Sequence, residues 1–533
     1  MKTCIVFLSI LVATRLLSVC SGYRILGVFP VNAKSHNIVF EALMKGLARR
    51  GHRVDVITHF PLQKPVKNYH EIVNLDGSME RLVNNYSMKF VKEISLVDPV
   101  ENMVMLYGNR ICDFMGFDEM QQLINNPPTN PPYDVVIVEA FMANCYFGLG
   151  HVLKVPVVAV CSSGAYPWLV ESSGNDDNPN VVPSVFLSHG AGPTMTLWER
   201  VKNFVSNRRD TSKFHALTGD YQTKAMRKYL GPDVPDIREM EKSVALTLVN
   251  DHPVIFGVKP VLPTWVHIAG LHIEENDEHL TPELKRWLDD SVHGVVYLSF
   301  GSMVLVESLP KEQLEEIYAA FAKIAPMRVL MKVVDESVLP AGLPDNVVTM
   351  PWIPQIPLLA HKNVKVFITH CGLGGILEAL YYGVPMIGVP LFADQFRNCR
   401  AFAEKETLIQ INFKELSDKV LNSALERITR DHSSYKEKAV HYSKIFKDQP
   451  ISPMNSAVFW IEYVIRNGQA LRPPTLDYTW WQLAGLDVHL IILFAFVLSS
   501  AMIFMSVKLM VKTISKLIIR NFYGTDKVTK KSQ

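Results

Sequence analysis

The stretch that decides the fold runs from Val364 to Gln395 and reads VKVFITHCGLGGILEALYYGVPMIGVPLFADQ. Its first residues, Val364 to Thr369, are mostly apolar and β-branched, as in a buried strand. The next six residues include three glycines and predict an irregular turn, after which apolar residues at helical spacing resume from Ile376 to Tyr382. Gly383-Val384-Pro385 then ends the helix before a second short strand.

A strand that leads through glycines into a helix presents free backbone N–H groups at its carboxyl end. The helix dipole reinforces these groups, and together they favour a phosphate. Glu378 lies one turn further along, within reach of a sugar hydroxyl, and Asp394 and Gln395 follow the second strand. The stretch therefore predicts a site for a diphosphate with a sugar on either side.

These residues resemble the signature of the UDP-glycosyltransferase family of animal, membrane-anchored enzymes that transfer glucuronate or glucose. The likeness extends from about Tyr23 to the C-terminus. The resemblance implies an α/β protein of GT-B type, with two Rossmann-like domains facing across a cleft and a C-terminal transmembrane helix. The matching positions are Trp352, Pro354, Gln355, His370, Cys371, Gly372, Gly375, Glu378, Gly383, Val384, Pro385, Asp394 and Gln395.

Length and composition set the outer bounds. A chain of 533 residues is too long for one core and predicts two or three domains. Lys and Arg number 54 against 52 Asp and Glu, so no basic surface favours nucleic acid. Of seven cysteines, Cys4 and Cys20 lie in the N-terminal segment and the other five are widely spaced, which predicts neither a disulfide framework nor a zinc site.

Both ends of the chain carry apolar segments. Residues 1–22 read as a cleavable signal peptide, and residues 488–507 are long and apolar enough to cross the lipid bilayer. Lysines and Arg520 dominate the tail, residues 508–533, so the positive-inside rule places it in the cytoplasm and the body in the lumen. Lys530 and Lys531 resemble a dilysine retrieval signal, which predicts an endoplasmic-reticulum membrane protein of single-pass type I; attraction of the basic tail to anionic lipid is the alternative.

Strands alternate with helices through both halves, as in parallel sheets covered on both faces. The boundary is expected in the Pro- and Gly-containing linker at 253–263. The predicted domains are an acceptor-binding Rossmann-like domain at 23–258, a UDP-sugar-binding one at 259–470, and a juxtamembrane segment at 471–487.

The expected strands are 24–29, 53–58, 133–138, 155–160, 244–250, 266–270, 294–300, 328–333, 347–350, 364–369 and 408–412. The expected helices include 35–50, 195–230, 311–324, 376–382, 395–404 and 417–429. A late helical region, 434–467, packs back toward the first half by resemblance.

The first βαβ unit argues against a dinucleotide enzyme. Its first turn, residues 30–36, contains no glycine, whereas a Rossmann dinucleotide site needs G-x-G-x-x-G there. A sugar-nucleotide oxidoreductase is therefore disfavoured. Residues 61–130 show no clean period, and the sequon Asn85-Tyr86-Ser87 is a candidate glycan site.

His36 is the candidate general base, because it follows Ser35, an expected N-cap, at a helix start whose dipole keeps an imidazole neutral. The resemblance implies an acidic partner from the second βαβ unit. That residue is Glu139 here, where Asp is usual, and Asn144 downstream is the other candidate. A carboxylate would fix the tautomer and support the imidazolium that forms.

On the donor side, the resemblance assigns Trp352 to stacking on uracil, Gln355 to the ribose side, and Glu378 to the ribose hydroxyls. The remaining assignments are His370 and the backbone of Gly372, Gly374 and Gly375 to the diphosphate, Ser302 to a phosphate oxygen, and Asp394 and Gln395 to the transferred sugar. No Asp-x-Asp is present, so we expect no metal: the helix dipole and His370 would neutralise charge. The UDP-sugar is the donor substrate, and no cofactor is expected.

The leading hypothesis is an inverting transferase that moves a hexose, with glucose as the expected sugar, from UDP to a hydroxyl of a small lipophilic acceptor. The alternative is a membrane-tethered protein that binds a UDP-sugar or a lipophile and has lost turnover. Expected partners are the UDP-sugar, the acceptor and the bilayer, with no nucleic acid. Whether copies of the chain form a homo-oligomer stays open.

Overall fold

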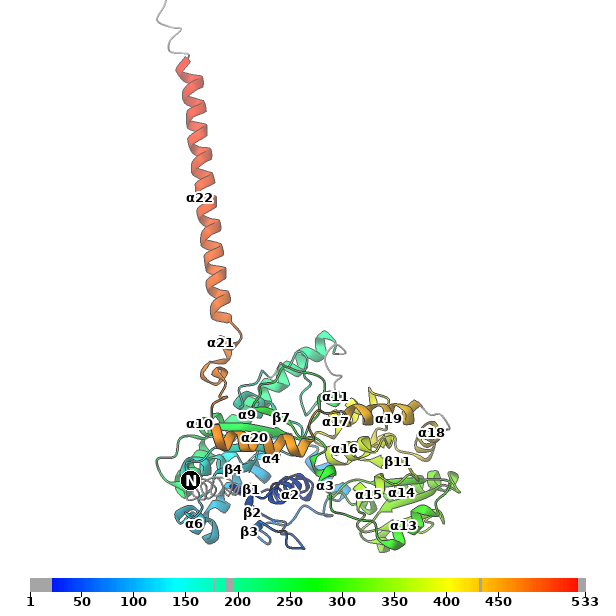
Figure 1. Ribbon diagram of the computed structural model, residues 1–533. Coiled ribbons are helices and arrows are strands. Elements are labelled where there is room, and N and C mark those ends of the chain that lie inside the picture. The colour runs from blue at the N-terminus through cyan, green and yellow to red at the C-terminus, as the bar shows by residue number, and fades with distance from the viewer. Residues whose placement is uncertain (1–21, 177, 188–194, 431–433, 526–533) are drawn as a thin grey trace, which may run out of the picture. The chain divides into compact units, whose positions relative to one another are not determined.

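The computed structural model describes residues 22–176, 178–187, 195–430 and 434–525, and side chains as far as Phe522. The predicted signal peptide, apart from Gly22, and the predicted dilysine pair therefore lie outside the described residues. The chain forms two units, Met1–Arg472 and Pro473–Gln533. Figure 1 shows the first as layered strands and helices and the second as one long helix with a short lead-in.

The first half of the larger unit is a seven-stranded parallel sheet in the order β3-β2-β1-β4-β5-β6-β7. Most of its strands are buried runs of apolar residues, as expected for a sheet covered on both faces. Two apolar cores cover the two faces, one centred on Phe147 and Phe214 and the other on Phe40 and Leu43. The strands are β1 (Arg24–Phe29), β2 (Arg53–Thr58), β3 (Tyr69–Asn74), β4 (Val135–Glu139), β5 (Val157–Cys161), β6 (Val244–Val249) and β7 (Trp265–His267).

Helices connect these strands. They are α2 (Lys34–Arg49), α3 (Met88–Ile94), α4 (Pro99–Val104), the π-helix η1 (Met105–Asn109), α5 (Arg110–Cys112), η2 (Asp113–Gly116), α6 (Asp118–Asn125), η3 (Asn144–Phe147), α7 (Gly148–Leu153), α8 (Pro167–Ser172), α9 (Leu197–Leu230), α10 (Ile237–Lys242), α11 (Pro253–Phe256) and α12 (Leu271–Glu274).

The second half is a six-stranded parallel sheet in the order β10-β9-β8-β11-β12-β13. Its strands are β8 (Val295–Ser299), β9 (Arg328–Lys332), β10 (Val347–Met350), β11 (Val364–Thr369), β12 (Met386–Gly388) and β13 (Leu408–Gln410). Its helical segments are α13 (Pro282–Asp289), η5 (Val306–Ser308), α14 (Lys311–Lys323), η6 (Glu336–Val338), α15 (Gln355–Leu359), α16 (Leu373–Tyr381), α17 (Gln395–Ala403), η7 (Phe413–Glu415), α18 (Asp418–Thr429), α19 (Ser434–Lys447) and α20 (Pro453–Asn467).

The predicted fold class is confirmed, but the expected boundary is not where the sheets divide. Residues 266–270 were expected to open the second half, yet β7 pairs with β6 and is the last strand of the first sheet. Three residues are too short to show a strand period, so the sequence could not assign β7 to either sheet. At the far end, α20 returns to the first half, where Met454 and Ile461 join its core.

A segment of the first half is built into the second. Tyr86 and Met88 pack in the core of the second sheet, and the Tyr86 N–H donates to Met303 O at 2.9 Å. Asn85 Nδ2 donates to Glu80 Oε1 and to Arg81 O, both at 3.1 Å. A glycan on Asn85 would take the place of one of the two Nδ2 hydrogens, so at least one of these hydrogen bonds would be lost, and the glycan site stays a prediction.

One disulfide, Cys112–Cys145, joins α5 to η3. The prediction that the cysteines form no disulfide framework therefore misses one bridge, because a spacing of 33 residues gives no hint of which cysteines meet. Cys161, Cys371 and Cys399 are free and buried.

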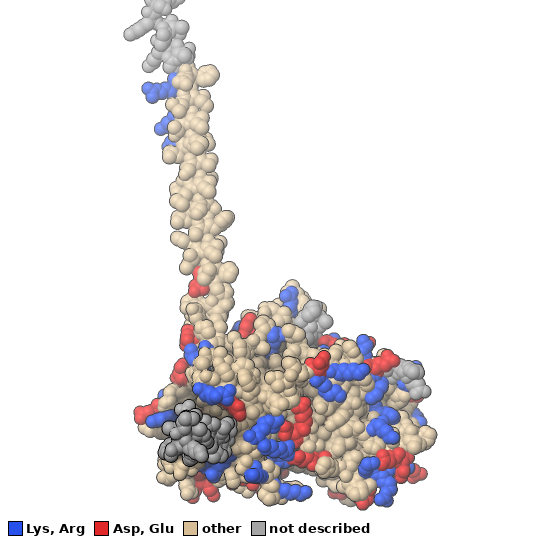
Figure 2. All heavy atoms as spheres, viewed as in Figure 1, with Lys and Arg blue, Asp and Glu red and all other residues tan. Residues whose placement is uncertain are grey.

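The smaller unit contains η8 (Pro474–Asp477), α21 (Trp480–Leu483) and α22 (Leu486–Thr525). Residues Leu486–Phe522 of α22 are long and apolar enough to cross a membrane. The described helix is longer than the predicted span at 488–507, because the basic residues beyond Val507 continue the same helix. Figure 2 shows α22 as a mostly uncharged column, with an acidic residue near its start and lysine or arginine only toward its far end.

Candidate active site

The glycine-rich turn starts a helix earlier than expected. Gly372 is the N-cap of α16, which begins at Leu373 and therefore includes Gly374 and Gly375, whereas the expected helix began at Ile376. Packing of Leu373 and Ile376 into the core outweighs the weak helix propensity of glycine. The first-turn N–H groups of α16 thus lie just beyond the carboxyl end of β11, where they are available to an anion.

His370 lies between two glycines at this turn. A β-carbon at Gly301 would stand 2.5 Å from His370 Cε1, and one at Gly372 would stand 2.6 Å from Nε2, so the ring needs both glycines. His370 Nδ1 and Ser302 Oγ are buried and have no hydrogen-bond partner among the described residues. Unpaired buried polar atoms are costly, and a bound phosphate would satisfy both.

Burial and the charge of Lys332 lower the pKa of His370 to about 3. The ring is therefore neutral at physiological pH, and the expectation that His370 neutralises the diphosphate charge does not fit the free protein. A neutral imidazole can still donate one hydrogen bond.

Lys332 supplies the positive charge that the sequence analysis missed. It ends β9, and its ammonium donates to Gly301 O at 2.8 Å and to Asn84 Oδ1 at 2.5 Å. Burial lowers its pKa to about 8. The ammonium also lies 5.3 Å from the ring centroid of Trp352. A lysine directly after three buried apolar residues, at the carboxyl end of a strand, is the sequence feature that could have indicated it.

The expected nucleoside side chains lie together. Trp352 is 40% exposed, so its ring can accept a stacked base. Gln355 Nε2 donates to Glu378 Oε2 at 2.7 Å, and Gln355 Oε1 accepts from Tyr297 at 2.9 Å. His272 Nε2 lies 3.2 Å from Glu378 Oε1. Both oxygens of the Glu378 carboxylate are thus oriented by partners that the sequence did not indicate, and each keeps a lone pair for a ribose hydroxyl.

Asp394 and Gln395 stand at the start of α17, after β12. Asn398 Nδ2 donates to Asp394 Oδ2 at 2.7 Å and to Cys371 O at 3.3 Å, which ties Asp394 to the glycine-rich turn. Gln395 Oε1 accepts from the N–H groups of Leu391 and Phe392, which leaves its amide nitrogen for a ligand.

On the acceptor side, His36 Nδ1 lies 2.7 Å from Glu139 Oε1. Because an ionised carboxylate can only accept, Nδ1 carries the proton of this hydrogen bond and Nε2 is left as the acceptor. Asn144, the other candidate partner, is hydrogen-bonded elsewhere: its Nδ2 donates to Glu241 at 2.7 Å. The Ser35 N-cap expectation is wrong, because α2 begins at Lys34 and Ala33 is its N-cap, without a side-chain cap.

His36 contacts one member of an aromatic cluster. Phe141 meets its ring edge-on with centroids 4.8 Å apart, and Tyr107 and Tyr166 flank Phe141 at 6.3 Å and 5.7 Å. Phe186 contacts Tyr166 in turn. Of these rings, Tyr107 comes from residues 61–130, where the sequence showed no clean period, and the others come from loops further along the first half.

The two sides approach each other within the larger unit. Burial raises the pKa of Asp394, and the Asn398 hydrogen bond and the charges of Arg397 and His36 oppose that shift. A β-carbon at Gly164, in the first half, would lie 2.8 Å from Nη1 of Arg397, in the second. The base and the residue expected to hold the sugar are therefore close enough to interact electrostatically.

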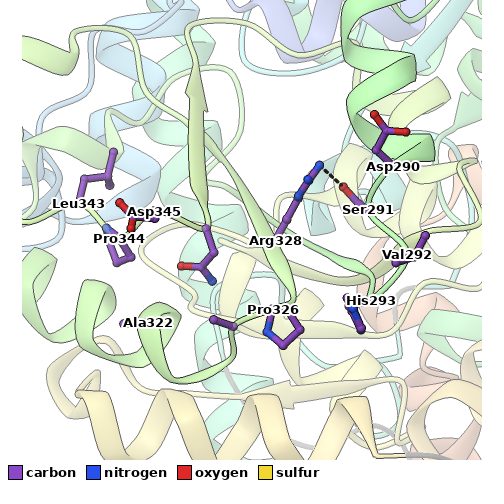
Figure 3. Close-up of a pocket in the computed structure, with 12 residues that line it drawn as sticks. Asp290, Ser291, Val292, His293, Ala322, Pro326, Arg328, Leu343, Pro344 and Asp345 are labelled. Atoms are coloured by element: carbon purple, nitrogen blue, oxygen red, sulfur yellow. Dashed lines mark hydrogen bonds between the residues drawn. The ribbon is translucent and has the colours of Figure 1, made fainter.

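A hollow of about 660 Å³ lies elsewhere, between Asp290, Arg328 and Asp345 (Figure 3). Arg328 is the first residue of β9, so this hollow is at the amino edge of the second sheet, opposite the loops that carry the site. Among the residues that the structure describes, no group of three or more His, Cys, Asp or Glu is arranged to hold a metal ion.

The fold is shared with solved glycosyltransferases. The structure of UDP-glucose: anthocyanidin 3-O-glucosyltransferase in complex with UDP matches with a TM-score of 0.55 and 16% identity, covering 84% of this chain and 99% of that one. The glycotransferase of kitacinnamycin matches with a TM-score of 0.53 and 17% identity, covering 83% and 98%. Two parallel Rossmann-type sheets joined in this way define the GT-B class.

Sequence comparison identifies the family. Residues 26–521 match the family model described as UDP-glucoronosyl and UDP-glucosyl transferase, and the chain belongs to this family. UDP-glucosyltransferase 2 of Dactylopius coccus is 33% identical over 97% of both chains. UDP-glucuronosyltransferase 1A6 of Homo sapiens is 30% identical over 85% of both. The chain is therefore similar to glucosyl- and glucuronosyltransferases along nearly its whole length.

Proposed function

We propose that this UDP-glycosyltransferase moves glucose from UDP-glucose to a hydroxyl of a small lipophilic acceptor, with inversion at the anomeric carbon. The observation that carries the proposal is the His36–Glu139 pair at 2.7 Å, with Asp394 near enough for His36 to influence its pKa. A base so placed can serve an acceptor that approaches the sugar from the side opposite the diphosphate.

In the proposed step, His36 Nε2 takes the acceptor proton while the acceptor oxygen forms its bond to the anomeric carbon. The bond from that carbon to the diphosphate breaks, and its electron pair leaves with UDP. Glu139 holds the His36 tautomer and stabilises the imidazolium. The first-turn N–H groups of α16 and the Lys332 ammonium stabilise the charge on the leaving diphosphate.

The assignment of glucose is supported by the relative named UDP-glucosyltransferase 2, at 33% identity. The lipophilic acceptor is supported by the ring of Phe141 against His36 and by Tyr107 and Tyr166, which contact Phe141. Aromatic walls with one polar contact bind flat apolar molecules that carry a hydroxyl.

The test is turnover by the full-length protein in lipid nanodiscs, with UDP-glucose, UDP-glucuronate and a panel of phenols and other lipophilic alcohols. The proposal expects a glucoside product whose β configuration, read by NMR coupling constants, shows inversion. Transfer of glucuronate alone would overturn the sugar assignment. Binding of UDP-glucose without any product would favour the binding-protein alternative.

We further propose that the protein spans the endoplasmic-reticulum membrane once through α22, with its body in the lumen. The disulfide Cys112–Cys145 supports an oxidising compartment. Changing Lys530 and Lys531 to Ser should release the protein to later compartments, whereas neutralising Lys512 and Lys516 should not. Retention of the double Ser variant would contradict the dilysine assignment.

A further inference from the structure

The amino-terminal part of α9 buries its polar face and exposes its apolar face, the opposite of the usual amphipathic helix. Its buried face is polar and includes Asn203, Asn207 and Asp210, each at most 3% exposed. Its exposed face is apolar, with side chains at helical spacing that share one stripe: Leu197 (64%), Trp198 (72%), Val201 (43%), Phe204 (45%) and Val205 (59%).

Hydrogen bonds fix this orientation of the helix. Asn203 Oδ1 accepts from the Ser184 N–H at 2.7 Å, and Asn203 Nδ2 donates to Pro179 O at 2.6 Å and to Val182 O at 2.8 Å. Asp210 accepts from Ser206 at 3.0 Å on the same helix. Because the polar face is held by specific partners, the apolar stripe stays outward, and a contiguous apolar stripe on a helix marks an interaction surface.

Cations border the stripe. Arg200, Lys202, Arg208 and Arg209 lie between residues 197 and 209, against the carboxylates of Glu199 and of the neighbouring Asp210, which accepts from Arg209 Nη2 at 2.7 Å. The Arg208 guanidinium lies 5.6 Å from the ring centroid of Phe204. Figure 1 shows this end of α9 projecting beyond the sheet layers of its unit, and Figure 2 shows lysine or arginine among uncharged atoms there. We call the five apolar residues and the four cations the α9 patch.

We propose that the α9 patch docks on the surface of a lipid bilayer that contains anionic lipids, with α9 lying at the interface and Trp198 and Phe204 inserted among the head groups. A helix with a tryptophan-containing apolar stripe flanked by arginine and lysine is the pattern that binds such a surface. The cations match the negative lipid charge, which favours this occupant over a second copy of the chain, whose α9 patch would carry the same positive charge.

If α22 spans the membrane, the short segment before it keeps the larger unit close to the lipid. The segment 473–485 that precedes α22 has 13 residues, which even fully extended reach only about 45 Å. Further along the same helix, α9 reaches the aromatic cluster of the acceptor side: Phe214 stacks on Trp168 at 4.4 Å, and Trp168 stacks on Tyr166 at 4.8 Å. On the proposed function, a lipophilic acceptor dissolved in the bilayer would then enter close to its site.

A nitroxide label at Val201→Cys in the full-length protein tests the proposal. Among the described residues, the native thiols are buried or in a disulfide, so the added cysteine reacts selectively. The matched control is Val338→Cys in η6, which is likewise exposed, at 56%. Both proteins are reconstituted into phosphatidylcholine vesicles with phosphatidylserine, and flotation of the vesicles first establishes that the chain is anchored.

We expect the label at 201 to be accessible to oxygen and protected from a water-soluble nickel chelate, at a depth of about 5–10 Å. The label at 338 should show the opposite pattern. Equal nickel access at both positions in floated vesicles would overturn the α9 patch proposal and leave anchoring by α22 intact. Dipolar broadening between labels at 201 would overturn it in favour of contact between copies of the chain.

A second variant tests function. Trp198→Ser with Phe204→Ser should slow transfer severalfold to an acceptor that partitions into the bilayer and leave transfer to a water-soluble acceptor unchanged. Val338→Ser is the control and should change neither rate. Equal loss with both acceptors would show that the double variant disturbs the fold and not membrane docking.

Discussion

The donor side and the acceptor side of this protein are built in different ways. Most donor-side groups come from one continuous stretch, residues 352–395, and several are backbone groups at the start of α16. The acceptor-side pair joins two residues 103 positions apart, His36 and Glu139, within rings drawn from separate loops. On the proposed function, a fixed local motif holds the UDP group, whereas the acceptor meets one base and rings from separate segments.

The difference extends to electrostatics. The donor side has the buried ammonium of Lys332 and buried polar atoms of Ser302 and His370 that have no hydrogen-bond partner. Such groups are expected at a site whose anion arrives with the substrate. The acceptor side has a histidine already paired with a carboxylate. Substitutions on the donor side should therefore mainly weaken the binding of UDP-glucose. Substitutions on the acceptor side should mainly lower the rate of transfer.

The largest expected effect is on the acceptor side. His36→Ala should lower the rate of transfer by about 10²- to 10⁴-fold, because a general base is lost. The affinity for UDP, measured by calorimetry, should stay nearly unchanged, because His36 contacts only the acceptor in the proposed step. Glu139→Gln should cost less, since the amide still orients the ring but cannot stabilise its charge.

Ser35→Ala is the matched control for His36→Ala. Ser35 lies in the same turn but is not the N-cap, so its removal should leave the rate unchanged. Equal losses of UDP affinity and of rate in His36→Ala would show that His36 is structural and would remove the contrast between the two sides.

The next effect is on the donor side. Trp352→Ala should weaken both UDP and UDP-glucose by about 5- to 150-fold, because stacking of a base on an aromatic ring is worth about 1–3 kcal/mol. Asp394→Ala should instead spare UDP and weaken only UDP-glucose, because Asp394 is proposed to bind the sugar. Titration of both ligands against both variants measures this, and uniform losses would contradict the division of roles.

The sequence predicted one side of the site better than the other for a physical reason. Strands 24–29, 53–58, 347–350 and 364–369 agree with the structure to the residue, because each is a short segment rich in β-branched and other apolar residues. The roles of Glu378 and Trp352 stay predictions. Their placement around the glycine-rich turn follows from their positions in one continuous motif. Of the two residues that orient Glu378, Gln355 belongs to the motif, but His272 could not be read from it, since it meets Glu378 across 106 positions.

Long-range packing explains the other misses. Lys332 acquires its environment from Asn84, which belongs to the first half, and nothing local to either residue indicates the contact. The strand β7, the start of α16 and the disulfide Cys112–Cys145 likewise depend on distant partners. Local pattern specifies the elements, and the tertiary fold specifies which of them meet.

Lys332 predicts a moderate pH effect confined to the donor side. Its pKa is lowered to about 8, so the ammonium is charged below that pH and is lost as the pH rises through it. Affinity for UDP-glucose should therefore fall above about pH 8, by at most about tenfold per pH unit. Lys332→Met should bind UDP-glucose more weakly at pH 7 and show no such fall. An unchanged pH profile in Lys332→Met would place the ammonium outside the donor site.

The smallest expected effect separates two neighbouring glycines. A β-carbon at Gly374 would have Glu378 Oε1 as its nearest neighbour at 3.9 Å, whereas one at Gly375 would lie 3.1 Å from Gln355 Nε2. Gly374→Ser therefore fits, and its hydroxyl in the first turn of α16 can donate to a phosphate. One added hydrogen bond is worth about 0.5–1.5 kcal/mol, so UDP should bind about 2- to 10-fold more tightly. Gly375→Ser should instead displace Gln355 from Glu378 and weaken UDP, and calorimetry on the pair measures both shifts. If both variants bind UDP equally well, the diphosphate does not lie at the start of α16.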